Sequence, residues 1–321
     1  EKLVPNAQGY DYYFGALGAN DANKVTLYEN RTKFETTNDM AGLSRLYTDK
    51  SIEFLEQQKQ DEPFFLYLAH TMMHVVIDAS PEFRNRTGKG IYADTLVELD
   101  HEIGRLLKKL EALGLAEDTL VLFTSDNGPW SNNHKFEAAK NANYVEWTKG
   151  PKTPWGTSGP LRGAKGSTWE GGVRVPAIVR WPGQVAAGST SDAIVSTLDV
   201  LPTFSALAAA ADKVPTDRTI DGFDQSQLLL GKSGEGSRNH FLYYHKGELQ
   251  AVRKGPWKLR MPNIKERYTK WPEFDHGTQE TELYNLVDDL SESNNLAGEK
   301  PEIVAELKAY AQQHAAKSAT K

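Results

Sequence analysis

The chain has 321 residues, of which 39% are hydrophobic, 10% aromatic and 25% charged. This composition is typical of a globular protein and excludes a disordered or fibrous chain, and the length suits one large domain or a domain with a smaller companion. The 37 basic residues are outnumbered by 43 acidic residues, which argues against nucleic acid as a partner. No apolar run reaches the roughly 20 residues that a membrane-spanning helix needs, so we expect no membrane span. Cysteine is absent, which excludes disulfides, thiolate metal sites and a cysteine nucleophile from this chain.

The central part of the chain alternates apolar runs with a helical pattern. Residues 63–69 and 119–125 are near-continuous apolar runs, which are typical of strands covered on both faces. Between them, apolar side chains from Leu96 to Leu113 recur at helical spacing, and Gly114 stands where a C-terminal cap belongs. This order predicts a β–α–β unit, and a third apolar run over 175–181 is expected to join the same sheet.

Further helices are predicted over 43–58 and over 199–211, where Asp199 can serve as the cap. From about residue 236 the pattern changes to short strands separated by glycine turns, followed by a helix from Pro301. The strands are expected over 241–245, 248–253 and 256–261. We therefore predict two domains, a larger one over 1–235 and a smaller α+β subdomain over 236–321.

Asp126 and Asn127 directly follow the predicted strand 119–125. Because ligand sites in open α/β sheets lie beyond the carboxyl ends of strands, this position suits a functional site. A carboxylate next to a carboxamide offers two hard oxygen donors, which favour Ca²⁺ or Mg²⁺ over Zn²⁺. The sequence Asp-Asn-Gly is also a common turn, and the residues alone leave both interpretations open.

Two further residues are candidates for acting on a charged substrate. His74 follows the predicted strand 63–69 by a few residues, and a histidine there could donate a proton to a leaving oxygen. Lys165 lies in a glycine-rich loop, where it could face an anion. Each could also be purely structural when taken alone, and we interpret His70 as a structural histidine with a satisfied hydrogen bond.

Three segments in order strengthen the functional interpretation: PFFLYLAHTMMH at 63–74, LVLFTSDNGPW at 120–130 and LRGAKGSTWEGGVRVPAIVRWPG at 161–183. Together they resemble the sulfatase family, specifically the arylsulfatase A-like group of the alkaline phosphatase superfamily. The resemblance extends over essentially the whole chain through GYDYYFGALG, AVRKGPWKLR and ELYNLVDDLSESNNLA. It implies an α/β fold with a sulfatase/alkaline phosphatase-like sheet flanked by helices, followed by a small C-terminal α+β subdomain.

The resemblance also implies roles for the candidate residues. Asp126 and Asn127 match one pair of the family's calcium ligands, so Ca²⁺ is the expected cofactor, with Mg²⁺ less favoured. Lys165 matches the sulfate-binding lysine, and His74 matches the histidine that contacts the sulfate near the leaving oxygen. The family's prolines on either side of that histidine are Met73 and Val76 here, which predicts a different loop shape.

The family's nucleophile is a formylglycine, made from the Cys or Ser of a (C/S)-x-P-x-R motif that comes near the N-terminus after a first pair of calcium aspartates. This chain begins downstream of that region, so we expect the formylglycine and two further calcium ligands in a segment that the sequence does not contain. The chain by itself is then expected to be inactive. Residues 158–162, SGPLR, fit the short pattern, but we do not interpret Ser158 as the nucleophile because it follows the Asp-Asn pair and overlaps the Lys165 loop.

The resemblance implies hydrolysis of a sulfate ester, either a small molecule or a sulfated glycan, by an exported enzyme that is periplasmic or secreted. Trp130 and His134 follow the metal pair and suit a sugar face, although such rings also anchor loops. His245, at a turn of the C-terminal strands, is a candidate for reaching the leaving group. Two alternatives stay open: a phosphoesterase of the same superfamily, which Asn127 disfavours because those enzymes hold zinc with a histidine, and a non-catalytic fragment that binds sulfated glycans.

Overall fold

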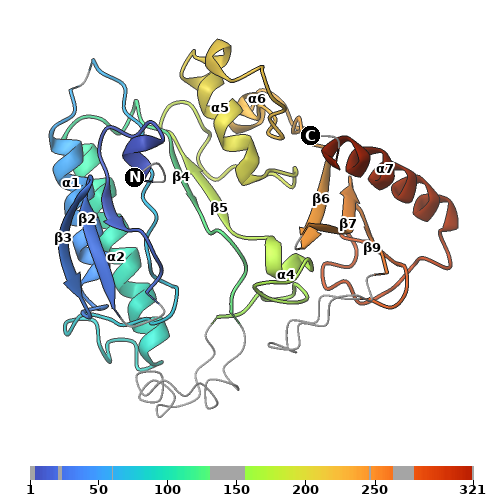
Figure 1. Cartoon of the computed structure of the whole chain (residues 1–321), viewed down its shortest axis with the longest axis horizontal. Helices are drawn as coiled ribbons and strands as arrows, with labels where there is room; N and C mark the ends of the chain where they lie inside the picture. The colour runs from blue at the N-terminus through green and yellow to red at the C-terminus, as the bar shows by residue number, and fades with distance from the viewer. Residues whose placement is uncertain are drawn as a thin grey trace. The chain divides into compact units, whose positions relative to one another are not determined.

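The computed structural model describes residues 4–20, 24–59, 61–130, 156–245, 247–262 and 278–319 (Figure 1). The chain divides into two compact units. Unit 1 comprises the described residues up to Thr119, and unit 2 comprises Leu120–Trp130 and the described residues from Thr157 onward. None of the helices within the described ranges combines the length and the apolarity that crossing a bilayer requires.

Unit 1 is built from an antiparallel sheet and two long helices that pack against each other (Figure 1). The sheet has the order β1-β2-β3, and its core face carries Val25 and Leu27, which pack with Leu43, Tyr47 and Ile77. The elements are the 3₁₀ helix η1 (Pro5–Ala7), strands β1 (Phe14–Ala16), β2 (Val25–Glu29) and β3 (Thr32–Thr37), and helices α1 (Leu43–Glu56) and α2 (Ile91–Ala112).

Both helices predicted for this part of the chain are confirmed, and Gly114 adopts the positive φ of 70° that a residue after a helix end commonly takes. The strand predicted over 63–69 is wrong for the described part of the molecule. Its side chains alternate in burial, with Phe65 56% and Tyr67 71% exposed, as expected of an extended chain. A strand also needs a hydrogen-bonded neighbour. No described strand pairs with this segment, so the predicted β–α–β unit does not form within the described residues.

Unit 2 begins with a two-stranded ladder between β4 (Val121–Thr124) and β5 (Ala177–Arg180). Both strands were predicted, but they pair antiparallel, with Thr124 opposite Ala177. The expectation of burial on both faces is wrong for the described residues, because Phe123 and Ile178 are 43% and 60% exposed. The short helix α4 (Glu170–Val173) precedes β5.

A group of short helices follows the ladder. Helix α5 ends at Leu207, earlier than the predicted 211, and Ala209 beyond it has a positive φ of 54°. The prediction that Asp199 caps this helix is wrong, because its side chain makes no cap hydrogen bond to α5. It closes the capping box of the preceding η3 instead: Asp199 Oδ2 accepts a hydrogen bond from the Ser196 backbone, and the Ser196 hydroxyl accepts one from the Leu198 backbone. The elements are η3 (Thr197–Asp199), α5 (Val200–Leu207), η4 (Ala211–Lys213) and α6 (Ser226–Leu229).

The C-terminal part of unit 2 is an antiparallel sheet covered by a helix (Figure 1). Three strands and the helix from Pro301 were predicted and are confirmed, whereas β9 was not predicted. Leu307 and Ala311 of α7 pack on Val252, Leu259 and Leu283. The elements are β6 (His240–His245), β7 (Glu248–Lys254), β8 (Trp257–Arg260), β9 (Glu282–Asn285) and α7 (Pro301–Ala319), with the strands in sequence order.

The environment of His70 predicts an acid-sensitive unit 1. The satisfied hydrogen bond expected for His70 is wrong for the described structure, because neither ring nitrogen has a partner among the described residues. Burial lowers the pKa of His70 to about 4 from 6.5. Because the folded-state pKa lies below the unfolded one, stability is lost as the pH falls from about 6.5 towards 4. The loss between pH 7.5 and pH 5 is expected to reach about 2 kcal/mol.

Urea denaturation at these two pH values measures the effect. The His70→Leu variant should lose about 2 kcal/mol less than the wild type on acidification, while a His101→Leu control, at an exposed histidine on α2, should keep the wild-type pH dependence. Equal pH dependence in wild type and His70→Leu would contradict the prediction.

Candidate functional site

The segment after β4 presents two oxygen-bearing side chains. Asp126 is exposed and its carboxylate makes no hydrogen bond or ion pair with a described residue. The Asn127 amide donates from Nδ2 to the carbonyl of Gly128 at 3.0 Å, and the Ser125 hydroxyl donates to the carbonyl of Asn127. The amide NH₂ is thus used within the turn, which leaves Asn127 Oδ1 and the Asp126 carboxylate as donors. This oxygen set fits a hard cation.

Within the ranges that the structure describes, no group of three or more acidic or histidine side chains is arranged to hold a metal. Asp126 and Asn127 alone fill only part of the six to eight positions of a Ca²⁺ ion.

Lys165 lies on a loop that is bonded directly to this segment. The Lys165 backbone N–H donates to the carbonyl of Pro129 at 2.9 Å, and Gly128 N–H donates to the carbonyl of Gly172 at 3.0 Å. The structure thus brings Lys165 into the same part of unit 2 as Asp126 and Asn127. The Lys165 side chain is half-buried.

Glycine is required where these two segments touch. A Cβ on Gly128 would collide with the backbone oxygen of Gly171, and one on Gly172 would collide with the backbone oxygen of Ser167. Gly163 and Gly166, on either side of Lys165, have φ values of 81° and 88°, a region that side chains other than glycine rarely enter. These glycines allow the two backbone segments to approach closely.

Ser158 is occupied with local hydrogen bonds. Its hydroxyl lies within donating distance of the carbonyls of Leu161 at 2.8 Å and Gly163 at 3.1 Å. This geometry makes Ser158 a turn residue, in agreement with its rejection as the nucleophile.

His74 belongs to unit 1 and is half-buried. Its Nδ1 lies 2.6 Å from the carbonyl oxygen of Val75. Because a carbonyl can only accept, Nδ1 carries the proton and Nε2 is the basic nitrogen of the neutral ring.

Asn20 holds the loop around His74 in place by hydrogen bonds. The sequence analysis did not identify Asn20 as a functional residue. The buried Asn20 amide donates to the carbonyls of His74 at 3.4 Å and Val76 at 3.0 Å. These bonds hold the loop without the two prolines usual in the family. The position of Asn20 two residues after the GYDYYFGALG segment is the only signal that could have pointed to it.

The remaining candidates are spread over the chain. Trp130 is half-buried and directly follows Pro129, the acceptor for Lys165. His245 is half-buried at the end of β6. His134 lies outside the described residues. These three stay predictions.

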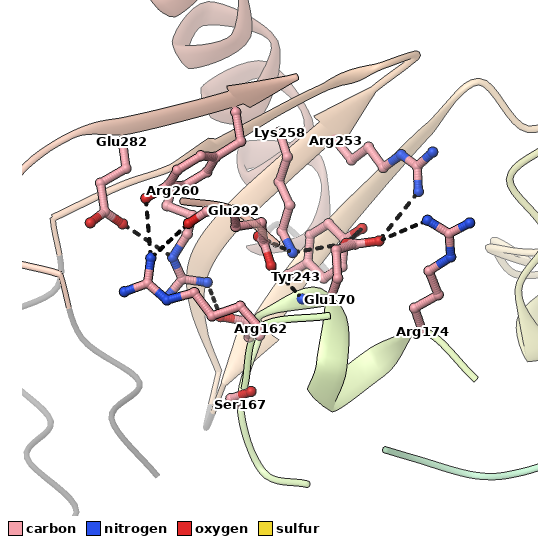
Figure 2. A network of polar contacts seen from close by, with 12 residues as sticks. Arg162, Ser167, Glu170, Arg174, Tyr243, Arg253, Lys258, Arg260, Glu282 and Glu292 are labelled. Carbon is pink, nitrogen blue, oxygen red and sulfur yellow. Dashed lines mark hydrogen bonds and ion pairs between the residues drawn. The ribbon is translucent and has the colours of Figure 1, made fainter. Parts of the chain in front are cut away.

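A buried network of charges joins the Lys165 loop to the C-terminal sheet (Figure 2). Lys258 Nζ on β8 lies 2.9 Å from Oε1 of Glu170 and 2.9 Å from Oε1 of Glu292. Burial by itself raises the pKa of Glu170, but the cations of Lys258, Arg253 and Arg174 outweigh it and hold this pKa below its usual value. No pattern in the sequence indicated this network.

Comparison with known protein families gives two matches. The sulfatase family matches residues 2–210, which is more than half of the chain, and a second family described as N-sulphoglucosamine sulphohydrolase, C-terminal, matches residues 164–317. The chain belongs to the sulfatase family. Members of this family typically use a metal ion and formylglycine.

Curated sulfatases are similar over most of this chain. Arylsulfatase G of Rattus norvegicus is 32% identical over 93% of the chain and 62% of its own length, and human arylsulfatase A is 38% identical over 79% of the chain and 49% of its own length. An N-acetylgalactosamine-6-O-sulfatase of Bacteroides thetaiotaomicron is 33% identical over 83% of the chain and 49% of its own length. The chain thus spans less than two thirds of these relatives.

Solved structures confirm the fold. A Bacteroides thetaiotaomicron sulfatase from work on glycosaminoglycan metabolism superposes with a TM-score of 0.81 at 24% identity, covering 98% of this chain and 74% of that one. A Pseudoalteromonas sulfatase has a TM-score of 0.78 at 22% identity, with 98% and 68% covered. The predicted α/β sulfatase fold with a C-terminal sheet and helix is therefore confirmed.

The contact between Gly128 and Gly171 predicts that the sulfatase chain does not tolerate a side chain at 128. Gly128→Ala should lower the free energy of unfolding by about 3 kcal/mol, because the colliding atom is backbone and cannot rotate away. Gly298→Ala is the matched control, since a Cβ there meets nothing within 4 Å, and should change stability by less than about 0.5 kcal/mol. Chemical denaturation of both variants tests this, and equal stability of the two would contradict the predicted collision.

Proposed function

We propose that this protein is a sulfuric ester hydrolase. The observation that carries the proposal is the pair of backbone hydrogen bonds that fastens the Lys165 loop to the segment of Asp126 and Asn127. A lysine and a pair of hard oxygen ligands held in one place suit a substrate with several anionic oxygens. Membership of the sulfatase family supports a sulfate ester as that substrate.

We infer a role for each residue from its chemistry. Lys165 binds a sulfate oxygen through its ammonium. His74 acts in its doubly protonated form: it donates the Nε2 proton to the leaving alkoxide oxygen, which departs as the alcohol, and the ring is left neutral with Nδ1–H still bonded to Val75. Asp126 and Asn127 hold Ca²⁺, which when bound would neutralise charge on the sulfate oxygens. The formylglycine nucleophile and the other metal ligands are proposed to come from outside these 321 residues.

The substrate is proposed to be a sulfated carbohydrate, with aryl sulfates accepted as simple analogues. A relative at 33% identity is named as an N-acetylgalactosamine-6-O-sulfatase, and a protein of the same fold was solved with its substrate D-glucosamine-2-N,6-O-disulfate. Trp130 and His245 are proposed to contact the sugar. His134 is proposed for the same role from its sequence position alone. An exported location, periplasmic or secreted, is proposed from the family.

Activity assays on the product of the full-length gene test the function. It should hydrolyse an aryl sulfate faster than the matching aryl phosphate, and Lys165→Ala should lower kcat/KM for the sulfate about 100-fold, because a charge-stabilising group is lost. Lys213→Ala is the control, since Lys213 is exposed and pairs only with Asp212 in the described structure. An unchanged rate in Lys165→Ala would remove the sulfate-binding role, and preference for the phosphate would favour a phosphoesterase.

The 321-residue chain alone should show no turnover of the same substrate. Robust turnover would place the nucleophile within this chain, and loss of that turnover in Ser158→Ala would identify it. Binding of sulfated sugars without turnover by the full-length product would instead favour a non-catalytic glycan-binding protein.

Metal binding can be followed with Tb³⁺, which replaces Ca²⁺ and luminesces when a nearby tryptophan is excited. Trp130 lies three residues after Asn127 and should sensitise the ion. Asp126→Ala should weaken Tb³⁺ binding at least about tenfold, because a carboxylate ligand is lost, while Asp212→Ala, at an exposed aspartate elsewhere in unit 2, should leave it unchanged. Equal titrations for wild type and Asp126→Ala would exclude Asp126 as a ligand.

A further inference from the structure

We propose that Lys258 is a positioning residue that holds the Lys165 loop in its anion-binding conformation, so that the C-terminal sheet sets the affinity for sulfate. Lys258 does not itself contact the substrate in this proposal. The inference rests on the proposed function in one respect, which is the assignment of Lys165 as the sulfate-binding residue.

The first support is the burial of three charges at one point. Lys258 and Glu292 are completely buried and Glu170 is 1% exposed. Figure 2 shows the Lys258 ammonium between the two carboxylates, one from α4 in the loop and one from the segment after β9. Buried charges are tolerated only when they are paired, so the position of Glu170 is tied to that of Lys258.

Glu292 holds the loop at two places. Its Oε2 accepts a hydrogen bond from the Glu170 backbone N–H at 2.7 Å, and its backbone carbonyl accepts from Arg162 Nη1 at 2.9 Å. Lys165 lies between these two attachment points in the sequence. The loop is therefore fastened on both sides of Lys165 to Glu292, whose carboxylate pairs with Lys258.

Trp169 adds a third attachment. The guanidinium carbons of Arg162 and Arg260 lie 3.7 and 3.5 Å from the centre of its ring. Two guanidinium groups at these distances from one ring cannot share a face, so Trp169 is held between them. The neighbouring Thr168 hydroxyl donates to Gln250 and accepts from Arg260, so residues 168–170 are all fixed to the sheet.

The other side of the loop carries the connection to the candidate site. Gly172 of α4 accepts the hydrogen bond from Gly128, and Gly171 donates to the carbonyl of Arg162 at 2.7 Å. A shift of Glu170 would move these two glycines and with them the backbone that presents Lys165. Lys258 is thus connected to Lys165 through a short series of fixed backbone groups.

The stability of the sheet rests mainly on other contacts. Leu307 and Ala311 of α7 pack against Val252, Leu259 and Leu283 of the sheet. Replacing a whole buried ion cluster by uncharged side chains often changes the stability of a protein little. The charge on Lys258 is therefore expected to matter more for the geometry of the loop than for the fold. This separation makes the proposal testable.

The test uses the product of the full-length gene and inorganic sulfate as the probe. Glu170→Gln is the mildest variant, because it keeps the shape of the side chain and the Lys258–Glu292 pair. Lys258→Met is the stronger one. The triple variant Lys258→Met, Glu170→Gln and Glu292→Gln removes the three buried charges in case the single variant does not fold, while Arg253 and Arg174 keep theirs. Lys254→Met is the matched control on the same sheet, since Lys254 pairs with the exposed Glu306.

Calorimetry should show that sulfate binds about tenfold more weakly to Glu170→Gln and to Lys258→Met or its neutral triple variant, and equally well to Lys254→Met. Hydrogen exchange should become faster in residues 162–173 while β6–β9 stay protected. In a double-mutant cycle, Lys165→Ala should have little further effect in the Glu170→Gln background, because both changes act through the same ammonium.

Unchanged sulfate affinity in Glu170→Gln would overturn the positioning role. The same holds if the fold-losses of sulfate affinity in Glu170→Gln and Lys165→Ala multiply in the double variant. The proposed function fails separately, if the wild type binds sulfate but does not hydrolyse sulfate esters. Absence of sulfate binding to the wild type would remove the anion site and with it this inference.

Discussion

The backbone contact between Gly128 and Gly171–Gly172 determines how the functional part of unit 2 is assembled. One segment carries the proposed metal ligands and the other carries Lys165, and the two approach until no Cβ fits between them. Two backbone hydrogen bonds span this contact. Because these bonds involve main-chain groups, the relation between the segments depends on glycine at the contact and little on the side chains around it.

Side-chain charges fix the same loop from its other side. Lys258 pairs with both Glu170 and Glu292 within a buried cluster, and two arginines enclose Trp169. The loop is thus held between a glycine contact and an ion cluster. The C-terminal sheet carries none of the proposed metal or sulfate ligands. It contacts the loop that carries Lys165 through the ion cluster and through Trp169.

The proposed chemistry is divided between the parts of the chain. Lys165, Asp126 and Asn127 belong to unit 2, and His74 belongs to unit 1, where Asn20 and Val75 orient its loop and ring. Charge stabilisation and proton donation are the roles proposed for these residues, and no group of three or more metal-binding side chains occurs among the described residues. The curated relatives are longer than this chain, which spans 62% of rat arylsulfatase G and 49% of human arylsulfatase A.

The sequence by itself determined those features that depend on local periodicity and on motifs. Helical spacing located α1 and α2, glycine turns located β6 to β8, and the family resemblance identified Asp126, Asn127, Lys165 and His74 as candidates. Ser158 was rejected from its order in the chain, and its hydrogen bonds explain its local role.

Only the tertiary structure decided features that depend on partners distant in the sequence. The run over 63–69 is as apolar as a strand, yet a strand exists only where a neighbour completes its hydrogen bonds, and no described strand does so. Strands β4 and β5 pair antiparallel. Hydrophobic periodicity locates a strand but does not tell in which direction it runs relative to its neighbour. Lys258, Glu170 and Glu292 are ordinary charged residues in the sequence, and they form a buried cluster only because the fold brings the Lys165 loop against segments that lie 88 and 122 residues further along the chain.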